Sequence, residues 1–142
     1  MSTSLPVFTS DWVRAWTGLI RDSEEYRSAA SGWEGSLLLL LPEQGRGAFL
    51  DLHRGECREG RAATPEDRGL ADVVITGDAS TWKAVLEGEL EPLTGVATGR
   101  LRLEKGSMTT LVMNAGAAKA LVATARGLDT VFPDQGQARP RP

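Results

Sequence analysis

The sequence has very few of the residues that build cross-links and metal centres. Its 142 residues include one cysteine and one histidine. A single cysteine cannot close a disulfide within the chain, and structural zinc sites need four cysteine or histidine ligands. We therefore expect neither an internal disulfide nor a bound metal.

Sequence motifs that position catalytic groups or nucleotides are also missing. The chain has no nucleophile elbow, no P-loop and no paired cysteine or histidine ligands. The segment 45–47 begins like a dinucleotide-binding loop, but it lacks the third glycine and does not open a helix, so it predicts a hairpin turn. Glu87, Glu89 and Glu91 lie in a segment broken by glycine, and we interpret them as solvated carboxylates. The sequence indicates no catalytic residue and no cofactor.

Charge of one sign does not accumulate along the chain. The 16 basic and 19 acidic residues are mixed and give a net charge of −3, so we expect no nucleic-acid partner. The N-terminus lacks a basic segment followed by an apolar one, which predicts a cytoplasmic protein. The longest apolar segment contains Asn114, Gly116 and Lys119, which argues against a membrane span. We expect at most transient contact with membranes.

Apolar residues make up 41% of the sequence, enough for the core of one domain. Ser2, Thr3 and Ser4 make the beginning of the chain small and polar, which predicts a flexible N-terminus over residues 1–7. Residues 133–142 consist mainly of Pro, Gly, Gln and Arg without periodicity, which predicts a disordered tail. The folded domain is expected over residues 8–132.

The first part of this domain predicts two helices. Thr9 can cap a helix in which Trp12, Trp16 and Ile20 follow helical spacing. The segment 24–30 resumes the helical pattern after a short interruption. Together they predict a helical lid.

Three hairpin-linked strands are expected next. Five consecutive leucines, 37–41, bounded by glycine and proline, predict a strand buried on both faces. Residues 48–53 predict a second strand, and the polar segment 56–62 predicts an exposed third strand. Residues 64–69 are expected to form a connecting loop.

The stretch from 71 to 126 alternates between strand and helix signals. The β-branched run 71–76 predicts a strand, after which Asp78 can cap a short helix that Gly88 ends. A second short helix can begin at Pro92, and strict alternation over 100–104 predicts a half-exposed strand. The pattern as a whole predicts an α+β fold.

One long helix is expected at the end of the domain. Ser107 can cap it, and the apolar pattern runs to Thr124 with a single charge. The apolar surface of this helix is wider than packing on a sheet requires, so it must touch other core residues, a partner chain or an apolar ligand.

Four segments between residues 71 and 103 resemble a known lipid-binding family. Ala-Asp-Val-Val-Ile-Thr-Gly-Asp, Thr-Trp, Leu-Glu-Gly-Glu-Leu-Glu-Pro and Thr-Gly-Arg-Leu-Arg-Leu are similar to the sterol-carrier-protein-2 (SCP2) family, with similarity over roughly residues 8–132. The resemblance implies a five-stranded, mostly antiparallel sheet covered by helices, with an apolar tunnel between them. It specifies the fold better than the ligand.

The resemblance also implies which residues line the tunnel. The tryptophans Trp12, Trp16, Trp33 and Trp82 are either core residues or cavity walls, and for Trp82 the resemblance favours the wall. The ligand-binding residues expected on this basis are Trp82, Leu86, Leu93, Val96, Leu103, Met108, Val112 and Met113.

We interpret the protein as a non-catalytic carrier of an apolar ligand: a fatty acid, a fatty acyl-CoA, a sterol-like molecule or another lipid. Burial of apolar area can supply affinity with few polar residues, which suits a sequence without catalytic motifs. The alternative is an accessory interaction module that forms a homodimer or binds a partner through the apolar C-terminal helix.

A third interpretation is a thiol enzyme. If the hairpin at Gly55 has a three-residue loop, His53 and Cys57 face each other, and the imidazole could activate the thiol. A two-residue loop would pair other residues, and no third group is evident that would orient the imidazole.

Overall fold

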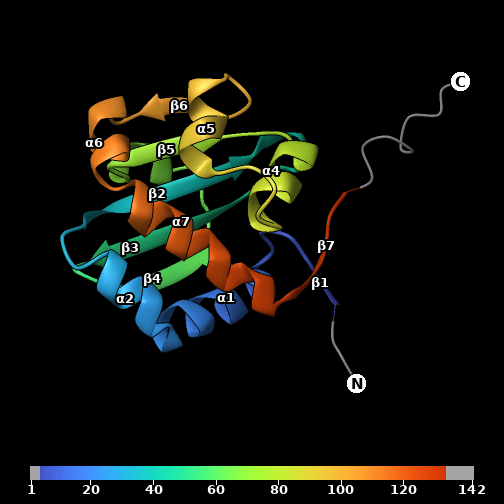
Figure 1. Ribbon diagram of the computed structural model, residues 1–142. Helices are drawn as coiled ribbons and strands as arrows, with labels where there is room; N and C mark the ends of the chain where they lie inside the picture. The colour runs from blue at the N-terminus through green and yellow to red at the C-terminus, as the bar shows by residue number, and fades with distance from the viewer. Residues whose placement is uncertain (1–3, 134–142) are drawn as a thin grey trace, which may run out of the picture.

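A five-stranded sheet in the order β4-β3-β2-β5-β6 forms the centre of the computed structural model, which describes residues 4–133 (Figure 1). Its strands are β2 (Glu34–Leu41), β3 (Arg46–His53), β4 (Glu56–Ala62), β5 (Val73–Thr76) and β6 (Arg102–Lys105). The pairs β2–β3, β3–β4 and β5–β6 are antiparallel, and β2–β5 is parallel. The predicted five-stranded, mostly antiparallel sheet is confirmed.

The leucine run lies in β2, the central strand, and both of its faces are covered. Leu37, Leu39 and Leu41 belong to the main core. Leu38 belongs to a smaller cluster on the opposite face, together with Phe49. Because side chains alternate along a strand, an unbroken apolar run suits this position, as predicted.

Helices cover the face of the sheet that carries the main core (Figure 1). They are α1 (Ser10–Asp22), α2 (Glu24–Ala29), α4 (Ala79–Leu86), α5 (Pro92–Ala97), α6 (Met108–Met113) and α7 (Ala115–Thr124). Two 3-10 turns complete the helical segments: η1 (Pro42–Gln44) connects β2 to β3, and η2 (Ala125–Gly127) follows α7. The predicted caps are confirmed, because the side chains of Thr9, Asp78 and Ser107 accept hydrogen bonds from backbone N–H groups of their first turns. Within the described residues, none of these helices combines the length and apolarity needed to cross a bilayer.

The expected single C-terminal helix is wrong, because it breaks at Asn114 into α6 and α7. Asn114 has φ −118° and ψ 26°, outside the helical range. Its Nδ2 donates a hydrogen bond of 2.8 Å to the carbonyl oxygen of Thr110. An asparagine side chain that binds nearby backbone competes with helical hydrogen bonds, which explains the break. Side chains before and after Asn114 therefore do not form one continuous stripe.

The expected flexibility of residues 1–7 does not hold for the described part of that segment. Ser4–Pro6 forms β1, which pairs in parallel with β7 (Asp129–Val131). Val7 is fully buried, and its backbone N–H donates to the carbonyl of Val131 at 2.9 Å. The pairing joins distant parts of the chain, which no local pattern could predict. Most of the predicted disordered tail, residues 134–142, lies outside the described residues.

The predicted loop 64–69 instead contains a short helix, α3 (Asp67–Leu70). The carboxylate of Asp67 is fully buried and accepts a hydrogen bond of 2.7 Å from the backbone N–H of Thr64. Arg61 of the neighbouring strand donates two further bonds to it. This buried pair fixes the crossover from β4 to β5.

Candidate functional site

An apolar cavity of about 70 Å³ lies between the sheet and the helices α4 to α7. Its floor consists of Leu37 and Leu39 from β2, Leu52 from β3 and Ile75 from β5. Leu39 and Ile75 are direct partners across the parallel pair of strands. Strand alternation brings these side chains to the face that carries the main core, so the register of the sheet creates the floor.

Helices and their connections form the remaining walls. The apolar wall residues are Trp33, Trp82, Val85, Pro92, Leu93, Val96, Leu101, Leu111, Ala117, Ala118, Leu121 and Val122. The ring of Trp82 is held in place from two sides. Its Nε1 donates to the carbonyl of Leu40 at 2.9 Å, and the ring packs edge-on against Phe8 with 5.4 Å between centroids. Its indole nitrogen is thereby satisfied, so the ring presents apolar surface to the cavity.

The structure brings three of the expected ligand-binding residues together at this cavity: Trp82, Leu93 and Val96. Leu86 lies in the main core and Leu103 packs against that core, and neither reaches the cavity. The spacing of apolar residues correctly predicted that Leu86 and Leu103 face the core. It could not predict which part of the core contains the cavity.

The prediction that Met108, Val112 and Met113 line the cavity is wrong. Their side chains are 37%, 54% and 78% exposed. Because the helix breaks at Asn114, α6 directs Leu111 toward the cavity instead. The prediction rests on one unbroken helix, and the break at Asn114 changes which side of the segment 108–113 faces the cavity.

Sequence reasoning missed several wall residues. The floor residues follow from the alternation of β2 once its pairing with β3 and β5 is known, but the sequence does not give that pairing. Of the four tryptophans, Trp33 and Trp82 line the cavity. Trp12 and Trp16 are fully buried in the main core. The sequence feature that could have indicated Trp33 as a wall residue is its position shortly before the leucine run, whose strand forms part of the cavity floor.

Two residues bring polar side-chain groups other than indole nitrogens to the cavity wall, Tyr26 and Asn114. Tyr26 is 1% exposed, and among the described residues its hydroxyl is the buried side-chain polar atom that has no hydrogen-bond partner. Burial raises the pKa of Tyr26 far above its ordinary value, and the nearby Cys57 adds to this shift. The hydroxyl is therefore neutral at physiological pH.

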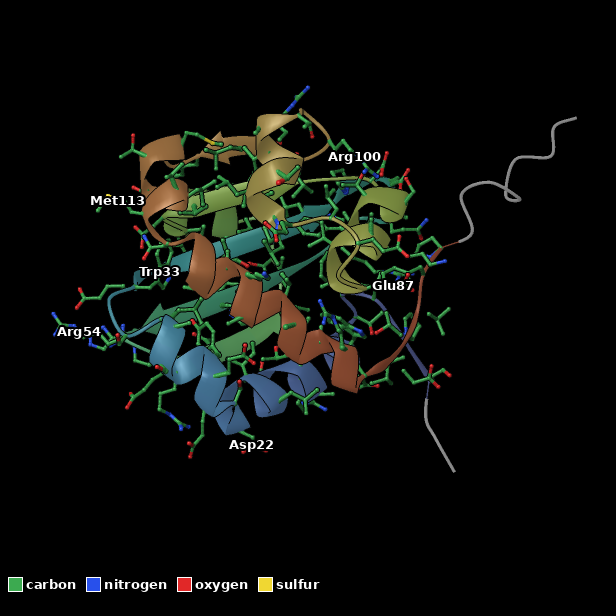
Figure 2. The ribbon with its side chains drawn as sticks, viewed as in Figure 1. Asp22, Trp33, Arg54, Glu87, Arg100 and Met113 are labelled. Carbon is green, nitrogen blue, oxygen red and sulfur yellow. The ribbon has the colours of Figure 1, made fainter. Side chains whose placement is uncertain are left out.

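A polar hollow adjoins the cavity and shares Trp33 and Asn114 with it. Its other residues are Ser31, Gly32, Glu34, Arg54 and Thr110. Arg54 and Glu34 form an ion pair there, and this pair lowers the pKa of Glu34. Figure 2 shows Trp33 and Arg54 at the same end of the molecule. The apolar cavity therefore has a polar neighbour on the surface at this end.

His53 and Cys57 do not face each other across the β3–β4 hairpin, as the thiol-enzyme interpretation would require. The β3–β4 hairpin has a two-residue loop, so His53 pairs with Glu56 and Cys57 pairs with Leu52. Both loop residues have positive φ, 50° at Arg54 and 88° at Gly55, as expected for a type I′ turn. Cys57 is buried, and this burial raises the pKa of its thiol to about 11. A neutral, buried thiol is a poor nucleophile.

Comparison with known proteins gives a family for this arrangement. Residues 17–122, more than half of the chain, match the SCP-2 sterol transfer family. A crystal structure of sterol carrier protein 2 is 41% identical, with a TM-score of 0.76, over 86% of this chain and 98% of that one. A conserved hypothetical protein from Thermus thermophilus, described as a possible sterol carrier protein, is 40% identical, with a TM-score of 0.78, over 92% of this chain and 94% of that one.

A more distant structure shares the fold. The apo form of sterol carrier protein 2 from Yarrowia lipolytica is 19% identical, with a TM-score of 0.51, over 83% of this chain and 96% of that one. No curated protein sequence matches the chain at a significant level.

Proposed function

This chain belongs to the SCP-2 sterol transfer family, and we propose that it binds one lipid molecule in the cavity between its sheet and helices and carries it unchanged. The observation that carries the proposal is the composition of the cavity wall. Four aliphatic side chains form the floor, and apolar side chains provide nearly all of the other walls. Each methylene group that such a wall removes from water contributes about 0.8 kcal/mol, so the affinity can come from buried area.

The proposed ligand is a fatty acid, a fatty acyl group or a sterol-like lipid. Pockets that bury molecules of this size measure about 300–1,000 Å³. The present cavity of about 70 Å³ is smaller, so the walls must separate when a whole lipid enters. We therefore regard the described conformation as the closed one.

Helix α6 is the element best suited to move. None of its residues is fully buried, so its displacement exposes little apolar surface. Asn114 interrupts the helical geometry between α6 and α7 and provides a hinge. The polar hollow lies beside this helix, because Thr110 and Asn114 contribute to it. We propose that the ligand passes between α6 and Trp33.

Within the wall, we propose Trp82, Leu93 and Val96 as ligand contacts, together with Leu111 and the floor of the sheet. No catalytic step is proposed, because the part of the wall that residues 4–133 form offers neither a nucleophile nor a paired acid and base. Its polar groups are indole N–H groups, a neutral phenol and an amide.

Titration of delipidated protein with a fluorescent long-chain fatty acid tests this function. We expect a dissociation constant of about 1 μM or lower, which corresponds to about −8 kcal/mol. Native mass spectrometry of protein purified without detergent should show a bound lipid. If no chain length binds at micromolar concentration, the carrier function is refuted.

A second candidate function rests on the exposed face of α6. Met108, Val112 and Met113 place large apolar side chains on one short helix, and Met113 lies at the outer edge of the molecule (Figure 2). Such a face suits self-association or a partner protein. Sedimentation of wild type and Met113→Lys tests it: a dimer that the substitution dissociates supports the interaction module, whereas a monomer at all concentrations rejects self-association.

A further inference from the structure

Tyr26, one of the residues that line the cavity, has a hydroxyl that the protein itself leaves without a partner. Tyr26 lines the cavity from α2 and is 1% exposed, and its hydroxyl oxygen is buried without a hydrogen bond to any described residue. Buried polar groups in native proteins almost always have partners, so an exception needs an explanation. A ligand in the cavity can supply the missing partner.

None of the described residues forms a hydrogen bond with the hydroxyl of Tyr26. The titratable group that acts on Tyr26 is the thiol of Cys57, whose Sγ already donates to the carbonyl of Glu59 at 3.5 Å. Cys57 lies opposite Leu52, a residue of the cavity floor. Tyr26 of α2 therefore lies near the part of the cavity wall that Leu52 of β3 forms.

We propose that the hydroxyl of Tyr26 forms a hydrogen bond with a neutral oxygen of the bound lipid and so selects ligands that carry a hydroxyl group inside the cavity. This inference rests on the proposed lipid-binding function and specifies its ligand class. A phenol can donate to such an oxygen and accept from it. A pure hydrocarbon leaves the hydroxyl unpaired, which disfavours its binding relative to an alcohol.

The lack of charged side chains in the described part of the wall favours neutral ligand groups over ionised ones. Among the described residues, no charged side chain lines the cavity. An ionised carboxylate next to Tyr26 would be buried without a cation, which is costly. The charged end of a fatty acid is better placed in the polar hollow, where solvent and Arg54 are available, although Arg54 is already paired with Glu34 there. The site at Tyr26 therefore favours alcohols over carboxylates.

Binding of 1-dodecanol, dodecanoate and dodecane to wild type and Tyr26→Phe tests the inference. The substitution should weaken 1-dodecanol binding about tenfold, which corresponds to about 1.4 kcal/mol, and leave dodecane binding unchanged or tighter. Cys57→Ala is the matched control, because it removes the thiol next to Tyr26 and keeps the hydroxyl. Its affinity for 1-dodecanol should equal that of wild type.

The single tyrosine of the chain permits a direct readout. In protein labelled with 3-fluorotyrosine, the ¹⁹F resonance should shift further with 1-dodecanol than with dodecane. The melting temperature of unliganded Tyr26→Phe should be equal to or above that of wild type, because an unpaired buried hydroxyl is removed. A large fall would show that the hydroxyl has a partner within the protein and would overturn the inference.

The outcomes separate this inference from the function on which it rests. If wild type binds none of the three molecules, the lipid-binding function fails. If it binds all three and Tyr26→Phe changes no affinity, lipid binding stands and the role of Tyr26 is rejected.

Discussion

Arg61 holds the buried carboxylate of Asp67 through two hydrogen bonds of 2.8 Å each, donated by its two terminal nitrogens. The guanidinium also lies over the ring of Phe49, 4.4 Å from its centroid. A planar guanidinium can satisfy a carboxylate and an aromatic ring together, which lysine cannot. The pair connects β4 to α3 and the smaller core cluster.

The first prediction concerns this pair. Asp67→Asn should lower the free energy of unfolding by about 2 kcal/mol, because Arg61 and the N–H of Thr64 lose a charged acceptor. Urea unfolding measures the change. Asp11→Asn is the control, since its ion pair with Arg14 is largely exposed and should contribute about 0–1 kcal/mol. Equal effects of the two substitutions would contradict the prediction.

The same pair predicts a pH dependence. The side chain of Arg61 lowers the pKa of Asp67 below its ordinary value. A carboxylate with a lowered pKa in the folded state adds stability that is fully present above its unfolded value of about 3.9. That stability is lost as the pH falls through the folded value. We expect the difference in stability between wild type and Asp67→Asn to shrink below pH 4.

The second prediction concerns the cavity. Ala117 is buried in the cavity wall, so Ala117→Leu should fill the space and weaken binding of a fluorescent fatty acid at least tenfold. Overpacking elsewhere costs about 1–3 kcal/mol, whereas here the added methyl groups enter empty space and the melting temperature should change little. Val112→Trp is the control, because Val112 is 54% exposed on α6. Blocked binding in Val112→Trp alone would place the site elsewhere.

The third prediction concerns a glycine in the β3–β4 turn. Gly55 has φ 88°, and a Cβ there would lie 2.5 Å from the carbonyl oxygen of Arg27. Gly55→Ala should therefore destabilise the protein by more than about 1 kcal/mol, since both backbone strain and a clash with backbone oppose it. Gly18→Ala should do the reverse and stabilise by up to about 1 kcal/mol, because alanine favours the helix. Gly18 lies in α1 with open space around it.

The fourth prediction concerns Cys57. Because burial raises its pKa to about 11, iodoacetamide should react slowly with the folded protein at pH 7 and quickly after denaturation. A thiol with a raised pKa adds stability that is present below its unfolded value of about 8.5 and lost as the pH rises through the folded value. His53→Ala should not change the alkylation rate, since His53 pairs with Glu56 instead. A fast reaction at pH 6 that needs His53 would restore the thiol enzyme.

The sequence alone predicted the elements whose signals are local. Thr9, Asp78 and Ser107 were correctly identified as helix caps, because a cap acts on backbone groups only two or three residues away. The leucine run was correctly identified as a strand buried on both faces, because only a strand covered on both faces needs apolar residues at every position. These local signals, in order, were enough for the α+β class, whereas the family was inferred from the resemblance of four segments to SCP2 proteins.

Tertiary structure decided which residues share the cavity and which chemistry is available there. Leu101 and Leu103 occupy equivalent positions in the alternating sequence, yet Leu101 lines the cavity and Leu103 only packs against the main core. The two-residue loop at Arg54 shifted the register and separated His53 from Cys57. The unpaired hydroxyl of Tyr26 was invisible in the sequence, because the pairing of a buried polar group depends on every element packed around it.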